Sequence, residues 1–123
     1  MIRYAIWAAV STEAQATTGE KVSLEVQETK CRETALGKGW KEVAGPYIVN
    51  GESRQRWVNL SDAEMEIPEL HALLEDAQAG RYDVLMLYDY NRLRDLLDMV
   101  SKSLSHYRVQ IFSVTQAVEP ILP

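Results

Sequence analysis

The sequence has a single cysteine, Cys31, and no long apolar run. One cysteine excludes an intramolecular disulfide and a cysteine-rich zinc site, and it is typical of a reducing, cytosolic compartment. No apolar stretch approaches the roughly 18 residues needed to cross a bilayer. The apolar N-terminus runs into Ser-Thr-Glu instead of the small residues of a cleavage site. We therefore expect a soluble, cytoplasmic protein with no signal peptide and no membrane contact.

An excess of positive charge is also absent. The chain has 13 basic and 18 acidic side chains, which give a formal net charge of −5. This balance argues against a DNA-binding protein that holds phosphates unaided, so any affinity for DNA should come from elsewhere. At 123 residues and 46% hydrophobic content, the chain is long enough for one domain with a real core and too short for two. We expect one domain over residues 1–123.

Apolar patterning divides this domain into alternating strands and helices. Apolar runs predict four strands, at residues 2–10, 40–50, 82–88 and 109–114. Apolar spacings of three and four predict three helices, over about residues 24–35, 68–79 and 93–104. Residues 50–67 have no sustained period and are expected to form a long loop. The order predicts an α/β fold, a mainly parallel sheet of about four strands with helices on both faces.

Polar side chains follow the first and third predicted strands. Ser11 ends the first strand, and its hydroxyl could act as a nucleophile at the sheet edge where ligands collect. Arg92 and Arg94 follow the third strand at a helix start, which suits a phosphate. The alternatives are structural. Thr12-x-x-Gln15 fits a capping box, and the arginines could be solvated residues of a first helical turn.

Five motifs occur in order along nearly the whole chain: Val10-Ser-Thr-x-x-Gln15, Ser23-Leu-x-x-Gln27, Pro68-x-Leu-x-x-Leu-Leu, Asn91-Arg-Leu and Val109-x-Ile-x-Ser-Val. In these motifs the chain resembles the catalytic domain of the serine site-specific recombinases, the resolvase and invertase family. It is especially similar to the large branch of phage integrases and transposon proteins. The resemblance implies DNA recombination with no metal and no cofactor. In that reaction a serine attacks a phosphodiester, forms a phosphoserine link to the 5′ end and releases a 3′ hydroxyl.

The resemblance also implies roles for individual residues. Ser11 matches the nucleophile, Gln15 a supporting polar group, Arg92 a phosphate-side arginine and Asp83 a buried structural or network acid. Because phosphoryl transfer depends mostly on positioning and charge stabilisation, arginines would carry most of the catalysis. The sequence identifies no general base, since both histidines lie away from the two strand ends.

Several positions depart from the family pattern. Ala9 and Ile67 stand where the family has arginines, and Asn91 stands where it has an aspartate. The second arginine after the third strand, Arg94, is one residue too early. Each lost phosphate contact would cost on the order of 2–4 kcal/mol in the transition state, although such losses are not additive. The predicted loop contains two further arginines that could bind the substrate in their place, Arg54 and Arg56.

Partners and competing functions follow from the same comparison. The family continues into an oligomerisation helix and a separate DNA-binding region, which this chain lacks, so we expect DNA binding and homo-oligomers only with such a C-terminal region. The main alternative is an inactive remnant of the fold that binds proteins through the face around Trp57 and the last helix. A phosphate-receiving signalling domain lacks its magnesium-binding acids after the first strand, and no aromatic pair is placed to enclose a flavin.

Overall fold

The computed structural model describes residues 1–10, 22–51 and 59–116. Its centre is a four-stranded sheet in the order β2-β1-β3-β4, and every neighbouring pair is parallel. The strands are β1 (Arg3–Val10), β2 (Lys41–Asn50), β3 (Val84–Leu87) and β4 (Gln110–Ser113). All four residues of β3 are buried, as expected for an inner strand covered on both faces. The predicted parallel sheet is therefore confirmed.

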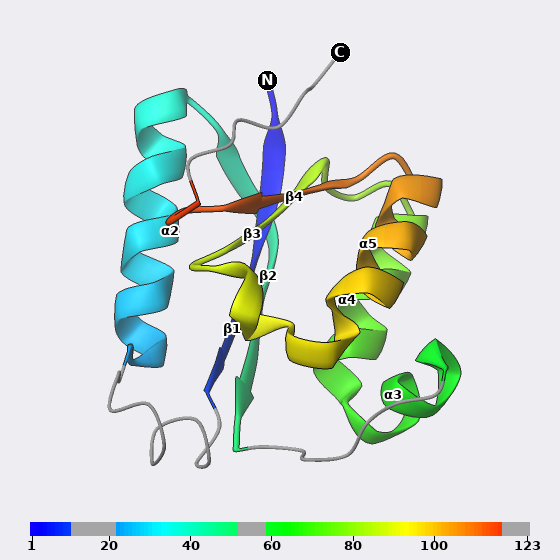
Figure 1. Cartoon of the computed structure of the whole chain (residues 1–123). Helices are drawn as coiled ribbons and strands as arrows, with labels where there is room; N and C mark the ends of the chain where they lie inside the picture. Colours follow the sequence, from blue (N-terminus) through cyan, green and yellow to red (C-terminus); the bar gives the residue numbers. More distant parts are fainter. Residues whose placement is uncertain (11–21, 52–58, 117–123) are drawn as a thin grey trace.

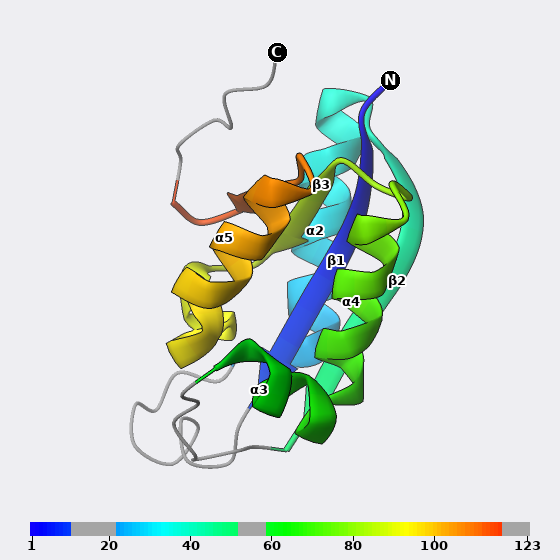
Figure 2. The same cartoon turned by 90° about the vertical axis from the view of Figure 1, so that its right-hand side faces the viewer.

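Helices cover both faces of this sheet (Figures 1 and 2). Helix α2 (Leu24–Lys38) lies on one face, and α4 (Pro68–Gln78) and α5 (Leu97–His106) lie on the other. Successive residues of β1 point to opposite faces. Ile6 accordingly packs with Cys31 of α2, whereas Trp7 packs in the core formed with α4 and α5. The sheet thus separates two hydrophobic cores.

Local sequence signals explain where α2 and α4 begin. The Ser23 hydroxyl caps α2 by accepting a hydrogen bond from the Val26 backbone N–H at 3.1 Å. Gly39 ends that helix in the left-handed conformation at φ 76°, which glycine adopts without steric cost. Pro68 opens α4, as predicted, and the predicted apolar stripe is buried: Leu70, Leu73, Leu74 and Ala77. Cys31 is buried on α2, and burial raises the pKa of its thiol to about 12.

The prediction of a loop over residues 50–67 is wrong for the second half of that range. Residues Leu60–Glu66 form a helix, α3, capped by Asn59, whose side chain accepts from the Asp62 N–H at 2.9 Å. Only Ala63 of this helix is buried. One buried residue in two turns leaves no apolar period for the sequence to show. Residues 52–58, which include Arg54, Arg56 and Trp57, lie outside the described residues.

The last predicted helix also begins later than expected. Two short 3₁₀ turns, η1 (Tyr90–Arg92) and η2 (Arg94–Leu96), precede α5, which begins at Leu97 instead of near residue 93. Arg94 has a φ of 53°, in the left-handed region. A residue in that region cannot continue a right-handed helix, so the chain turns there before α5 starts. Across the described ranges, no helix combines the length and apolarity that spanning a bilayer requires.

Candidate active site

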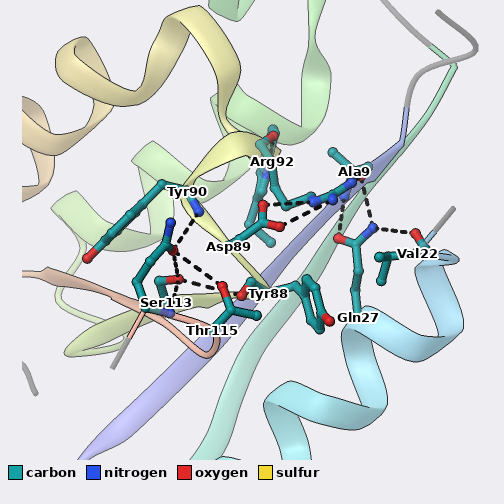
Figure 3. A network of polar contacts seen from close by, with 11 residues as sticks. Ala9, Val22, Gln27, Tyr88, Asp89, Tyr90, Arg92, Ser113 and Thr115 are labelled. Atoms are coloured by element: carbon teal, nitrogen blue, oxygen red, sulfur yellow. Dashed lines mark hydrogen bonds and ion pairs between the residues drawn. The ribbon is translucent and has the colours of Figure 1, made fainter. Parts of the chain in front are cut away.

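The turn η1 is attached to the carboxyl end of β1. The indole Nε1 of Trp7 donates to the backbone oxygen of Arg92 at 2.9 Å, and Nη1 of Arg92 donates to the backbone oxygen of Ala9 at 3.4 Å. Figure 3 shows Arg92 reaching across to Ala9. The ends of β1 and β3, which the sequence predicted to be neighbours, therefore meet at one edge of the sheet.

Arg92 is held in a defined orientation at this edge. Its Nε donates to Asp89 Oδ1 at 3.0 Å and its Nη2 donates to Asp89 Oδ2 at 3.3 Å. Both side chains are only 16% exposed. With the contact to Ala9, these bonds use three of the five guanidinium N–H donors. Within the described part of the chain, one donor on each terminal nitrogen is left for a ligand or water.

Asp89 is the acid that pairs with Arg92, although the family pattern has its aspartate one residue before the arginine. The sequence has Asn91 at that position, and the paired carboxylate comes instead from Asp89, three residues before Arg92. A bidentate carboxylate fixes the plane of a guanidinium and balances its charge. The departure at Asn91 therefore leaves Arg92 oriented, but with a partner that offsets its attraction for anions.

Gln27 is a second polar group at this edge, and its only predicted significance was membership of a motif. The side chain is completely buried. Its Oε1 accepts from the Ala9 N–H at 3.1 Å, and its Nε2 donates to the backbone oxygens of Ala9 at 3.0 Å and Val22 at 3.1 Å. The amide thus binds Ala9 as a neighbouring strand would, and joins the start of α2 to the end of β1 (Figure 3).

A signal for Gln27 was present in the sequence. Gln27, Cys31 and Ala35 share one buried stripe of α2 at spacings of four, so an amide occupies a position that apolar residues normally fill. A buried amide requires hydrogen-bond partners. That requirement could have identified Gln27 as a site residue, but only the fold shows that its partner is the backbone two residues before Ser11.

The other predicted site residues are placed as follows. Arg94 lies on the next turn and is exposed, and no hydrogen bond or ion pair of the described residues joins it to Arg92 or Asp89. Ser11 and Gln15, with the Thr12 capping box, lie outside the described residues. The roles of all these residues stay predictions.

The remaining titratable groups lie elsewhere. Asp83 accepts from Arg3 Nη2 at 2.9 Å at the amino edge of the sheet, and these hydrogen bonds lower its pKa. It is only partly buried, so the expected burial is wrong, and its role as a structural or network acid stays a prediction. His71 contacts Glu64 and Glu75 on the surface of α3 and α4. In the ranges that the structure describes, no group of three His, Cys, Asp or Glu side chains could hold a metal ion.

Comparison with known families decides what kind of domain has this arrangement. A family model described as "Resolvase, N terminal domain" matches residues 5–120. The chain belongs to this family. The resemblance to serine recombinases is thereby confirmed, and DNA recombination is the function that the resolvase domain carries at the level of the family. A search among curated proteins finds no match.

Solved structures share the fold. The N-terminal catalytic domain of TP901-1 integrase superposes with a TM-score of 0.66 at 20% identity, over 94% of this chain and 79% of that one. The C-terminal catalytic domain of ISC1926 TnpA, an IS607-like serine recombinase, gives a TM-score of 0.64 at 24% identity, over 94% and 72%. The corresponding domain of IS1535 TnpA gives 0.58 at 18%, over 90% and 70%. The resolvase-like α/β fold is therefore confirmed.

Proposed function

We propose that this resolvase domain cleaves and rejoins DNA with Ser11 as the nucleophile. The Ser11 Oγ–phosphorus bond would form as the bond from phosphorus to the 3′ oxygen breaks. The serine proton leaves, and the 3′ oxygen takes up a proton to become a hydroxyl. The observation that supports this proposal is the oriented Arg92, which contacts Ala9 two residues before Ser11 and, among the described residues, has two N–H donors left for a ligand.

Arg92 would bind a non-bridging oxygen of the scissile phosphate. Donors already fixed where charge develops stabilise a transition state without reorganising. Asp89 orients the guanidinium from one side, and Trp7 holds the backbone of the same residue from the other. In this scheme Gln15 assists Ser11, and Arg94 makes a second phosphate contact.

DNA and further copies of the protein are the proposed partners. With a formal net charge of −5, the domain would depend on another region to bring DNA to it. Arg54 and Arg56 are the candidates for a local contact with the DNA backbone. Reaction on two DNA strands would require a homo-oligomer, and the proposed setting is the cytoplasm.

A trapping assay tests the role of Ser11. The chain is fused to a heterologous DNA-binding domain, so that DNA carrying its operator is held at high effective concentration beside a randomised flank. We expect a covalent protein–DNA adduct that peptide mapping assigns to Ser11. Ser11→Ala should abolish it, while Ser101→Ala, an exposed serine on α5, should retain it. A fusion that binds its operator without forming an adduct contradicts the proposal, as does an adduct on another residue.

A second function is an inactive recombinase fold that serves as a protein-interaction module. Ala9 and Ile67 stand in place of arginines, and Asp89 balances the charge of Arg92. This alternative predicts no adduct in the trapping assay. It also predicts that inorganic phosphate does not shift the nuclear magnetic resonance signal of the Arg92 Nε–H. The same two measurements therefore separate the two functions.

A further inference from the structure

The chain beyond β4 stays beside the turn that carries Arg92. The Val114 N–H donates to the backbone oxygen of Leu87 at 2.9 Å, and the Thr115 N–H donates to that of Tyr88 at 3.0 Å. These bonds extend the pairing of β3 with β4 past the end of both strands. Gln116 is thereby brought next to η1.

The side-chain oxygen of Gln116 is the centre of a small polar network. It accepts hydrogen bonds from the Ser113 hydroxyl, from Thr115 Oγ1 at 3.4 Å and from the Tyr90 backbone N–H at 3.4 Å. Ser113 is completely buried, and its Oγ accepts in turn from the Gln116 N–H at 3.4 Å. The Ser113 Oγ also lies 3.5 Å from the backbone oxygen of Tyr88. Figure 3 shows Ser113, Thr115 and Tyr90 around this point.

Among the described residues, Gln116 is the hydrogen-bond partner of the Tyr90 N–H. Asp89 precedes η1 as its cap residue and makes no side-chain capping bond; its carboxylate is bound to Arg92. The first N–H groups of a helical turn have no partner inside the turn and need one from outside. Gln116 provides it from the segment after β4, while Trp7 holds the other end of the same turn through the Arg92 carbonyl.

We propose that Gln116, oriented by the buried Ser113, is a positioning residue for Arg92. It holds the first N–H of η1, which a side chain at the cap position does not reach, and so restrains the turn from which Arg92 projects. The value of this position for catalysis rests on the proposed function, in which Arg92 binds the scissile phosphate. Gln116 itself touches neither Arg92 nor the proposed phosphate; it acts through the Tyr90 backbone.

Three variants of the full chain test the proposal. Gln116→Met keeps the length of the side chain and removes the acceptor, Gln116→Glu keeps an acceptor oxygen, and Gln78→Met is a control at an exposed glutamine on α4. Because Gln116 is exposed, we expect all three to fold with the melting temperature of the parent within a few degrees. Nuclear magnetic resonance then follows two signals, amide exchange at Tyr90 and the Nε–H resonance of Arg92.

We expect Gln116→Met to accelerate exchange at Tyr90 about fivefold, as for a lost hydrogen bond of about 1 kcal/mol, and to shift or broaden the Arg92 resonance. Gln116→Glu should restore both signals and Gln78→Met should change neither. A purely structural role would lower the melting temperature without moving the Arg92 resonance. Unchanged exchange and an unchanged Arg92 resonance in folded Gln116→Met overturn the proposal.

Titration with inorganic phosphate separates this proposal from the one on which it rests. We expect phosphate to shift the Arg92 resonance in the parent and to do so about tenfold more weakly in Gln116→Met, because misplacement of an oriented group can cost up to about 100-fold. An equal response in both proteins overturns the positioning role and leaves the function of Arg92 standing. No response in the parent overturns both.

Discussion

Two arginine–aspartate pairs lie at opposite edges of the same sheet in different surroundings. At the amino edge, Arg3 binds Asp83 through Nε and Nη2, and the two side chains are 41% and 38% exposed. At the carboxyl edge, Arg92 binds Asp89 with both side chains 16% exposed, and is also joined to Ala9. The first pair is a solvated link between two strands. The second is an oriented cation in a partly desolvated site, so the surroundings of a pair decide its role.

Removing each arginine in turn tests whether the two pairs differ in role. In the trapping fusion, Arg92→Ala should slow adduct formation by about 100- to 1000-fold, the typical loss for one preorganised donor. Arg92→Lys should recover little, because an ammonium cannot make the bidentate contact to Asp89. Arg3→Ala is the matched control and should leave the rate within about twofold of the parent. Rates are measured by quenching with detergent and counting adducts.

Equal losses for Arg3→Ala and Arg92→Ala would contradict the distinction between the edges. They would indicate that both pairs act only on stability. Comparing the melting temperatures of the two variants would then show whether the slower rate follows from unfolding.

The second prediction concerns the buried amide that only the carboxyl edge has. Gln27→Leu leaves the N–H of Ala9 without its acceptor and removes two bonds donated by a completely buried amide. We expect a loss of about 2–3 kcal/mol in the free energy of unfolding, measured by urea denaturation. Gln78→Leu, at an exposed position, should change it by about 0.5 kcal/mol or less. A Gln27→Leu variant as stable as the parent would show that the backbone of Ala9 finds other hydrogen-bond partners.

The third prediction concerns the solvated pair and its dependence on pH. Arg3 lowers the pKa of Asp83 below its ordinary value of 3.8. A lowered pKa in the folded state gives stability that is present above the ordinary pKa and is lost as the pH falls through the lowered one. Asp83→Asn should therefore lower the free energy of unfolding by roughly 0.2–1 kcal/mol at pH 7. At a pH below the lowered pKa of Asp83, it should not change the free energy of unfolding. Urea denaturation at both pH values checks this, and a difference that persists in acid contradicts it.

The smallest expected effect is at the exposed contact between α3 and α4, which lies toward the carboxyl edge in Figure 2. Glu64, and to a lesser extent Glu75, raises the pKa of His71 above its ordinary value of 6.5. A raised pKa gives stabilisation that is complete below 6.5 and disappears as the pH rises through the raised value.

Titration of the His71 ring by nuclear magnetic resonance should therefore give a midpoint above 6.5, and Glu64→Gln should lower it. Glu66→Gln, an exposed change at the end of α3, is the control and should leave it unchanged. A midpoint that Glu64→Gln does not move would exclude Glu64 as the main cause.

Much of the fold follows from local patterns. The apolar runs of β1 and β3, the Pro68 start of α4 and its leucine stripe were all predictable, because each depends on periodicity or on a backbone preference of nearby residues. Helix α3 was not, since Ala63 is its only buried residue and its stability comes from a cap and from contact with α4. The late start of α5 was not predictable either, because it depends on the left-handed turn at Arg94.

By itself, the sequence determined the parallel α/β architecture, the resolvase family and the meeting of two strand ends at one edge, because hydrophobic period and strand order are properties of the chain. Only the tertiary structure decided which carboxylate orients Arg92, where the Gln27 amide binds and how Trp7 and Gln116 hold η1. Most of those contacts join residues between 18 and 85 positions apart, and the bonds of Asp89 to Arg92 and of Gln27 to Val22 are local. Hydrogen bonds require an approach of about 3 Å, which only the packed sheet and helices define.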